Sequence, residues 1–173
     1  PATIVMPTTT PLVKVNNTKD YGAKVILHGE TFDDAAALAA QLSQEDGLTY
    51  VHPFNDPAVA TGQGTITYEI FQDLPDVDVI LVPIGGGGLA TGVSTLAKLL
   101  NPNVTVIGVE PECFMAQDLQ HDGLTQLIVT RSMAERKSRM IELGDAFIAF
   151  PGGTGTLEEI TEVMSQVSLG QLS

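Results

Sequence analysis

The feature that most constrains the fold is a continuous apolar run that ends in four glycines. Residues 79–82 read Val-Ile-Leu-Val, and the glycines occupy positions 85–88. An apolar run without polar alternation is typical of a strand buried on both faces, as in a parallel sheet. A helical pattern of apolar residues begins directly after the glycines and continues to Leu100. The stretch therefore predicts a strand, a glycine turn and a helix in immediate succession.

This glycine turn is a candidate anion site. Glycines leave backbone N–H groups accessible where the next helix begins, and the positive end of the helix dipole lies at the same place. Tight packing of the strand against the helix is the alternative explanation, but four consecutive glycines exceed what such a turn needs. We therefore predict that Gly85, Gly86, Gly87 and Gly88 bind a phosphate group.

A second stretch of the same design lies near the C-terminus. Residues 146–150 are apolar, and after Pro151 come Gly152, Gly153, Thr154, Gly155 and Thr156, followed by a helical pattern. Turns at the carboxyl ends of parallel strands meet at one rim of an open α/β sheet, where such folds bind ligands. The sequence thus predicts one ligand site between the two glycine turns.

The order of the expected elements alternates between strand and helix along the whole chain. The expected strands are residues 2–5, 24–27, 48–51, 79–82, 104–109, 124–129 and 146–150. With right-handed crossovers, this order predicts an α/β fold. It is a doubly wound, mainly parallel, Rossmann-like sheet of about seven strands with helices on both faces. We expect a single domain over residues 1–173, with a sub-boundary near residues 53–57.

Charge and cysteine usage limit the classes of partner. The chain carries 21 acidic against 8 basic residues, a net charge of −13, which argues against nucleic acid and membrane surfaces as partners. A small anionic ligand remains compatible, because helix N-termini act locally. The lone Cys113, together with the lack of a spanning segment or signal peptide, predicts a cytoplasmic protein. The three histidines have no metal-ligand spacing, so no metal site is predicted.

Two cations on a C-terminal helix are the most informative anomaly. Ser132-Met-Ala-Glu135 is a capping box, and the helix that it starts turns Arg136 and Lys137 toward its buried side. Buried cations require partners. In a structural explanation, the two cations form ion pairs within the protein or extend their charged groups to the surface. The alternative, which we favour, is that they contact an anion or a substrate. Glu159 ends a second capping box that begins at Thr156, and it flanks the apolar stripe of the last helix.

The first two thirds of the chain resemble the middle of the threonine dehydratases, which are fold-type II pyridoxal-phosphate enzymes. The motifs that carry this resemblance are Ile4-Val-Met-Pro7, Ala23-Lys-Val-Ile-Leu-His-Gly29, Asn55-Asp-Pro57, Gly62-Gln-Gly-Thr65, Val82-Pro-Ile-Gly-Gly-Gly-Gly-Leu89 and Val106-Ile-Gly-Val109. The resemblance implies that the four-glycine turn holds the cofactor phosphate. It also places the lysine that forms the Schiff base ahead of Pro1, which argues against binding of pyridoxal phosphate here.

Residues from about 121 to 173 resemble a different family, the cytokinin riboside monophosphate phosphoribohydrolases. The motifs are Gly123-Leu-Thr-Gln-Leu127, Ser132-Met-Ala-Glu-Arg-Lys137 and Phe147-Ile-Ala-Phe-Pro-Gly-Gly-Thr-Gly-Thr-Leu-Glu-Glu159. This resemblance implies that Arg136 and Glu159 are catalytic and that Gly152 to Thr156, with Lys137, bind a nucleotide phosphate. It also implies a homodimer.

Because one chain carries the signatures of two families, we hypothesise that it is a hybrid. The segments from the two families would meet near residues 104–120. Since each family's motifs are incomplete, we expect a chimeric or engineered scaffold without efficient catalysis. It would require no cofactor and would keep a site for phosphate or AMP. One alternative is a phosphoribohydrolase that cleaves the N-glycosidic bond of a nucleoside monophosphate. A second alternative is a pyridoxal-phosphate-binding remnant without deaminase activity.

Overall fold

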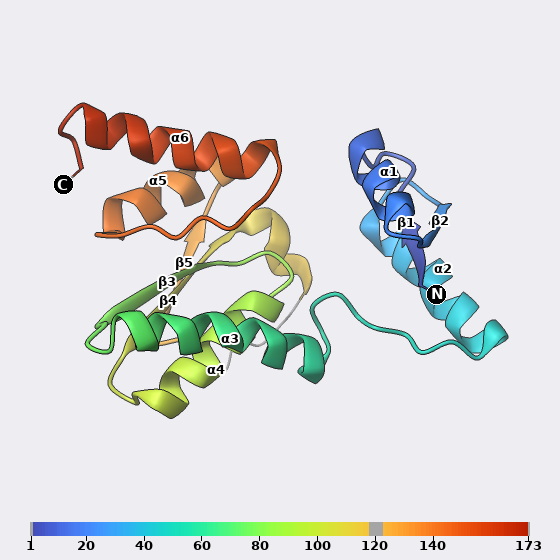
Figure 1. Ribbon diagram of the computed structural model, residues 1–173, viewed down its shortest axis with the longest axis horizontal. Helices are drawn as coiled ribbons and strands as arrows, with labels where there is room; N and C mark the ends of the chain where they lie inside the picture. The colour runs from blue at the N-terminus through green and yellow to red at the C-terminus, as the bar shows by residue number, and fades with distance from the viewer. Residues whose placement is uncertain (1, 118–122, 173) are drawn as a thin grey trace. The chain divides into compact units, whose positions relative to one another are not determined.

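The computed structural model describes residues 2–117 and 123–172. The chain divides into two compact units, Pro1–Val51 (unit 1) and His52–Ser173 (unit 2), and each contains its own small parallel sheet (Figure 1). The division lies beside residues 53–57. Whether the two units act as the single domain that the sequence suggests stays a prediction.

Unit 1 is a two-stranded parallel sheet with two helices. Its elements are β1 (Thr3–Met6), α1 (Leu12–Asp20), β2 (Lys24–Leu27) and α2 (Phe32–Asp46), and Thr3 pairs with Lys24 at the start of the ladder. A capping box starts α2, because Thr31 and Asp34 satisfy each other's backbone N–H groups. Gly47 ends the helix in the left-handed conformation, with φ of 64°.

Unit 2 contains a three-stranded parallel sheet between two pairs of helices. Its elements are α3 (Pro57–Asp73), β3 (Val79–Pro83), α4 (Gly88–Leu100), β4 (Thr105–Pro111), the 3₁₀ helix η1 (Glu112–Gln117), β5 (Gln126–Thr130), α5 (Met133–Leu143) and α6 (Thr154–Ser168). The strand order is β3-β4-β5, and Val82 pairs with Gly108. Figure 1 shows α3 and α4 on one side of this sheet and α5 and α6 on the other.

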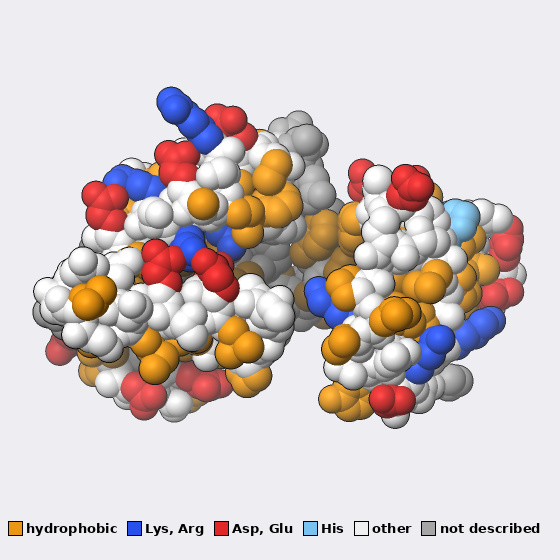
Figure 2. Space-filling view, turned by 90° about the horizontal axis from the view of Figure 1, so that it is seen from above, with side chains coloured by type: hydrophobic (Ala, Val, Ile, Leu, Met, Phe, Trp, Pro, Cys, Tyr) orange, Lys and Arg blue, Asp and Glu red, His pale blue; other side chains and the backbone are white. Residues whose placement is uncertain are grey.

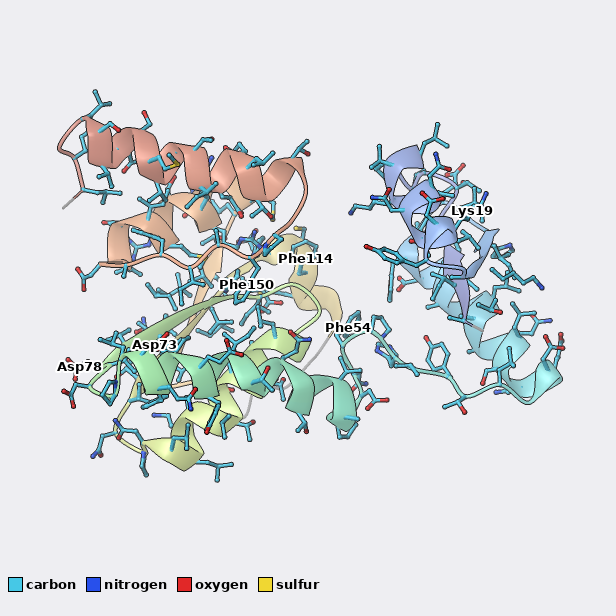
Figure 3. The ribbon with its side chains drawn as sticks, viewed as in Figure 1. Lys19, Phe54, Asp73, Asp78, Phe114 and Phe150 are labelled. Atoms are coloured by element: carbon cyan, nitrogen blue, oxygen red, sulfur yellow. The ribbon has the colours of Figure 1, made fainter. Side chains whose placement is uncertain are left out.

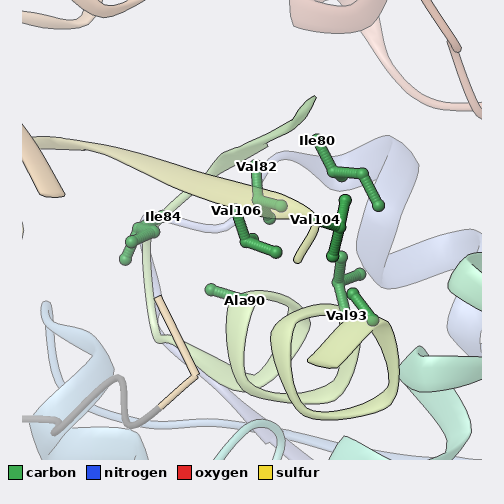
Figure 4. Close-up of a cluster of buried hydrophobic side chains, with 8 residues drawn as sticks. Ile80, Val82, Ile84, Ala90, Val93, Val104 and Val106 are labelled. Atoms are coloured by element: carbon green, nitrogen blue, oxygen red, sulfur yellow. The ribbon is translucent and has the colours of Figure 1, made fainter. Parts of the chain in front are cut away.

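The core of unit 2 lies between the sheet and α4. The buried side chains of this core come from β3, from β4, from the residues next to these strands and from α4 (Figure 4). They are Ile80 and Val82 of β3, Ile84 directly after β3, Val104 directly before β4, Val106 of β4, and Ala90, Val93 and Ala97 of α4. Burial alternates along β3, because Ile80 and Val82 are buried whereas Val79 is 47% exposed. The apolar run therefore does form a strand, but only one of its faces is fully buried.

The two helices on the core side pack through glycines. A Cβ atom on Gly92 of α4 would lie 2.1 Å from the carbonyl oxygen of Ala60 of α3, and one on Gly64 would lie 3.1 Å from the oxygen of Gly92. The hydroxyl of Thr67, which is fully buried, donates to the carbonyl of Val93 at 3.1 Å. The backbones of α3 and α4 thus approach more closely than side chains would allow.

The α/β class and the parallel pairing are confirmed, but the single sheet of about seven strands is wrong. The described residues form five strands in two sheets, and neither residues 48–51 nor residues 146–150 form a strand. Apolar composition made both segments resemble strands, but a strand also needs a neighbour for its backbone hydrogen bonds. Ile148 and Phe150 are 65% and 54% exposed, so this second apolar run is not a core strand.

The helices in the described ranges all lack the combination of length and apolarity that crossing a bilayer requires.

Candidate functional site

The four-glycine turn leads from β3 directly into α4. The N–H of Ile84 still donates to the carbonyl of Val109 at 2.9 Å, which extends the sheet pairing to the edge of the turn. Gly87 is the N-cap of α4 and has a φ of 82°, and no side chain caps the helix there. Among the described residues, no hydrogen bond from the protein occupies the amides of Gly85 to Gly88. The start of α4 therefore presents a group of unsatisfied N–H donors, which favour an anion.

Phe54 packs directly against this turn. A Cβ atom on Gly86 would lie 2.5 Å from the ring of Phe54, and one on Gly88 would lie 2.9 Å from its Cα atom. At Gly85, by contrast, a Cβ atom would meet nothing within 4 Å among the described residues. Figure 3 shows Phe54 on the segment that leads into α3. Packing therefore accounts for two of the four glycines, and the open side of the turn lies at Gly85.

The segment that carries Phe54 is shaped by two side-chain caps. The ring nitrogen Nδ1 of His52 accepts hydrogen bonds from the N–H of Asn55 at 2.8 Å and from the N–H of Phe54 at 3.3 Å. The carboxylate of Asp56 then caps α3 by accepting from the N–H of Ala58 at 2.7 Å. His52 entered the sequence predictions only as one of three histidines without metal-ligand spacing, and Phe54 was not among the predicted site residues. The His-Pro-Phe-Asn-Asp-Pro spacing ahead of a helix is the signal that could have directed attention to both.

A buried carboxylate lies at the same edge of the sheet. Glu110 is the sixth residue of the seven in β4, is only 6% exposed, and its backbone carbonyl accepts from the hydroxyl of Thr130 at 3.4 Å. A Glu within an apolar strand has no motif of its own, so Glu110 was not among the predicted site residues.

The structure brings Arg136 together with Glu159. The two side chains form an ion pair at 3.4 Å between Nη2 and Oε1, and the Arg136 side chain is 12% exposed. Lys137 pairs with Glu158 and with Glu162, the latter at 2.5 Å. These carboxylates raise the pKa of Lys137 above its usual 10.5, with the hydrogen bond to Glu158 as the largest cause. The described contacts of both cations are therefore ion pairs that join α5 to α6.

The surface view agrees with this arrangement. Figure 2 shows basic side chains partly covered by acidic ones on the face of unit 2 that carries α6. One polar atom of the cluster has no partner among the described residues, because the Nε of Arg136 is buried without a hydrogen bond. The predicted catalytic roles of Arg136 and Glu159 stay predictions.

The second glycine turn differs from the prediction in how its helix starts. Helix α6 begins at Thr154 with Gly153 as its N-cap, so Thr156 lies inside the helix and the expected capping box from Thr156 to Glu159 does not form. Figure 1 shows this turn toward the same end of unit 2 as the four-glycine turn. Among the described residues, no hydrogen bond or ion pair joins Gly152–Thr156 to Gly85–Gly88. The binding roles of Lys137 and of Gly152, Gly153, Thr154, Gly155 and Thr156 stay predictions.

Comparison with known proteins identifies relatives over almost the whole chain. The family model described as "Pyridoxal-phosphate dependent enzyme" matches residues 1–164. The L-threonine ammonia-lyase of Thermotoga maritima is 55% identical over 169 residues, which are 96% of this chain and 40% of that protein. The L-threonine ammonia-lyase of Geobacter sulfurreducens is 48% identical over 137 residues, which are 78% of this chain and 34% of that protein. The chain thus spans less than half the length of these relatives.

Solved structures of a threonine deaminase and a serine racemase also match the chain. The processed form of threonine deaminase isoform 2 from Solanum lycopersicum has a TM-score of 0.60 and 50% identity, covering 64% of this chain and 32% of that one. Maize serine racemase has a TM-score of 0.69 and 27% identity, covering 83% of this chain and 53% of that one.

These findings correct several predictions. The matched region runs without a break across residues 104–120, so the hybrid of two families, the engineered chimera and the phosphoribohydrolase segment are wrong. The inert scaffold and the N-glycosidic hydrolase are wrong too, because the relatives are ammonia-lyases. The expectation that no cofactor is required, with pyridoxal phosphate argued against, is overturned by the family match. The resemblance to threonine dehydratases is confirmed and reaches further along the chain than predicted.

Proposed function

The chain belongs to the family of pyridoxal-phosphate dependent enzymes, and from this premise we propose that the turn Gly85–Gly88 holds the phosphate of pyridoxal phosphate. The observation that carries the proposal is the set of unsatisfied amides at the start of α4. A phosphate placed there receives several N–H donors and lies at the positive end of the helix dipole.

The residues of the turn fit such a group. The open position beside Gly85 leaves room for a phosphate to approach the backbone, and Gly87 adopts a positive φ that turns the chain into α4. The net charge of −13 does not oppose binding, because the contacts are short-range backbone donors rather than side-chain charges. A small anionic ligand is therefore the partner that we propose for unit 2.

We propose further that the chain supplies the phosphate-binding part of an L-threonine ammonia-lyase. The names and identities of the relatives support this activity, which releases ammonia from L-threonine. When bound, pyridoxal phosphate delocalises the negative charge that develops at the α carbon of an amino acid. The contribution of unit 2 is to bind and orient the cofactor through its phosphate.

Neither lysine of unit 2 is proposed as the residue that bonds to the cofactor. Lys98 donates to the backbone carbonyls of Pro102 and Val104 beyond the far end of α4, and Lys137 is paired with two carboxylates. Their described contacts are structural, so the role proposed for unit 2 rests on backbone amides alone.

Nuclear magnetic resonance of the whole chain tests the phosphate site. Pyridoxine 5'-phosphate is the probe, because its alcohol cannot form an imine with surface lysines. We expect the amide resonances of Gly85 to Gly88 and Leu89 to shift, whereas pyridoxine without the phosphate leaves them in place. The change Gly85→Ala puts a methyl group in the open position. It should weaken binding by about tenfold or more, which is the loss of roughly one charge-assisted hydrogen bond.

Gly62→Ala is the matched control. Gly62 lies on the exposed side of α3, and a Cβ atom there meets nothing within 4 Å among the described residues. It should bind the probe as the unchanged chain does. Shifts confined to another part of the chain, or unaltered binding by Gly85→Ala, would contradict the proposed site.

A further inference from the structure

His52 lies two residues before Phe54, the residue that packs against the four-glycine turn. We infer that His52 is a positioning residue. Its unprotonated Nδ1 holds residues 52–55 in a turn, and this turn places Phe54 against Gly86 and Gly88. The inference rests on the proposed function, because the surface that Phe54 shapes is the proposed phosphate cradle.

The hydrogen bonds of His52 define its chemical state. Nδ1 accepts from two backbone N–H groups, at 2.8 Å from Asn55 and at 3.3 Å from Phe54. A ring nitrogen that accepts cannot itself carry a proton, so the ring is the tautomer protonated at Nε2. The amide of Asn55 makes the shorter and stronger of the two contacts.

The pattern of these bonds is that of a side-chain cap. An Asn or Asp side chain commonly accepts from the backbone N–H groups two and three residues further on, and His52 does the same with its ring nitrogen. Asp56 repeats the pattern immediately afterwards with Ala58 and Val59 at the start of α3. Two successive caps therefore fix the backbone at Phe54, one on each side of it.

The position of Phe54 matters because it touches the glycine turn through its backbone as well as its ring. Its Cα and carbonyl oxygen both lie 2.9 Å from where a Cβ of Gly88 would be, and its ring lies 2.5 Å from that of Gly86. The rings of His52 and Phe54 meet edge to face, with centroids 4.6 Å apart. Loss of the cap would release Phe54 from the turn and change the space in front of the first amides of α4.

Two substitutions separate the acceptor of His52 from its ring. In His52→Asn, Oδ1 lies the same number of bonds from the backbone as Nδ1, so the acceptor is kept and the ring is lost. In His52→Phe, the ring and its contact with Phe54 are kept and the acceptor is lost. If the role of His52 is purely steric, His52→Phe should bind the probe better than His52→Asn. If His52 is a positioning residue, His52→Asn should bind the probe better than His52→Phe.

The test measures binding of pyridoxine 5'-phosphate to the whole chain by amide shifts at Gly85 to Gly88. We expect His52→Asn to bind within about threefold of the unchanged chain. His52→Phe should bind about tenfold more weakly, because the half-buried N–H of Phe54 and the exposed N–H of Asn55 lose their shared acceptor and Phe54 is no longer held in place. Equal binding by both variants, or weaker binding by His52→Asn than by His52→Phe, would overturn the inference.

Nuclear magnetic resonance spectra of the chain without the probe test the role of His52 independently of binding. In the unchanged chain, the ¹⁵N shifts of the His52 ring should report an unprotonated Nδ1. The amides of Asn55, Gly86 and Gly88 should keep their shifts in His52→Asn and move in His52→Phe. If the unchanged chain binds no probe, the proposed function fails while these shifts still decide the role of His52. If the probe binds but the two variants do not differ, the phosphate site stands and the positioning role fails.

Discussion

At Gly86 and Gly88 the lack of a side chain is required by a neighbour, because Phe54 occupies the space that a Cβ atom would take. Gly87 is required for a different reason, namely its φ of 82°, a conformation that strains residues with a Cβ atom. Gly85 meets nothing within 4 Å among the described residues, so packing does not account for it, and the proposed phosphate gives a reason for a glycine there. The run of four identical residues thus combines packing, conformation and the proposed binding.

A pH-dependent contribution to stability is expected at Asp34, the residue that completes the cap of α2. Its carboxylate accepts from the N–H groups of Thr31 and Glu30, each at 3.0 Å, and from the Thr31 hydroxyl at 2.9 Å. The backbone hydrogen bond from Thr31 is the largest cause that lowers the pKa of Asp34 below its usual 3.8. Because the pKa is lower in the folded chain, the carboxylate stabilises the fold above the unfolded pKa. This stabilisation is lost as the pH falls through the folded value.

Urea unfolding of Asp34→Asn, followed through signals of unit 1, checks this expectation. The variant should be less stable than the unchanged chain at pH 7. The difference should shrink as the pH falls below 3.8 and through the lowered pKa of the folded carboxyl, where this group protonates as well. Asp33→Asn, in the same helical turn, keeps the capping box and is the matched control. If the free energies of unfolding of Asp34→Asn and the unchanged chain differ by the same amount at pH 7 and at the acidic pH, the predicted pH dependence is contradicted.

At the scale of elements, the contact between α3 and α4 depends on glycines that each helix presents to the other. Gly92→Ala would place a methyl group 2.1 Å from the carbonyl oxygen of Ala60, so the helices would have to separate. We expect this change to lower the free energy of unfolding by about 1–3 kcal/mol, the usual cost of overpacking. Gly62→Ala, at an exposed position of α3, should instead raise it by up to about 1 kcal/mol, because alanine favours a helix interior.

Thermal or urea unfolding of the two variants measures this contrast directly. The comparison controls for helix propensity, since both substitutions replace glycine by alanine within helices of unit 2. Equal stability of the two variants would show that the helices do not depend on the close approach at Gly92.

Helices α5 and α6 illustrate a different kind of contact between elements. The amphipathic pattern of α5 correctly indicated that Arg136 and Lys137 need partners, and the partners are Glu159, Glu158 and Glu162 of α6. The pattern could not identify these carboxylates, which follow the cations by more than twenty residues. It favoured an anionic ligand for the same reason, because a buried cation alone does not specify whether its partner is a side chain or a ligand.

At the scale of the whole molecule, the two units differ in how much core each possesses. The main core cluster draws on unit 2 alone, whereas Val15 and Ala35 are the buried apolar residues described in unit 1. We expect residues 52–173 expressed alone to keep their sheet and helices. We expect residues 1–51 alone to be largely unfolded, because a two-stranded sheet with so small a core is marginal in water.

Heteronuclear spectra of the two fragments and the whole chain check this asymmetry. Amide resonances of the 52–173 fragment should overlay those of the same residues in the whole chain, apart from residues near the cut. Collapse of their dispersion would show that unit 2 depends on unit 1. A well-dispersed spectrum of the 1–51 fragment would show that its small core is sufficient.

The sequence by itself determined the features that arise from neighbouring residues. The apolar run before Gly85 formed a strand as predicted, and Ser132 starts α5 as predicted by accepting from the N–H of Glu135. The carboxylate of Glu135 accepts from the N–H of Arg131, one residue before the cap, so the predicted capping box is only half formed. Strand propensity, caps and glycine turns act over a few residues, which is why local pattern indicates them. The motifs around Val82–Leu89 also correctly indicated the family.

Only the tertiary structure decided which distant groups meet. Within the described ranges, the apolar run 146–150 pairs with no strand. Phe54 accounts for two of the glycines, and the cations of α5 are paired with carboxylates of α6. Each outcome depends on partners brought together by packing of the chain. A backbone ladder, a close contact and an ion pair each need two segments of the chain. The local sequence pattern describes one segment and does not identify the other.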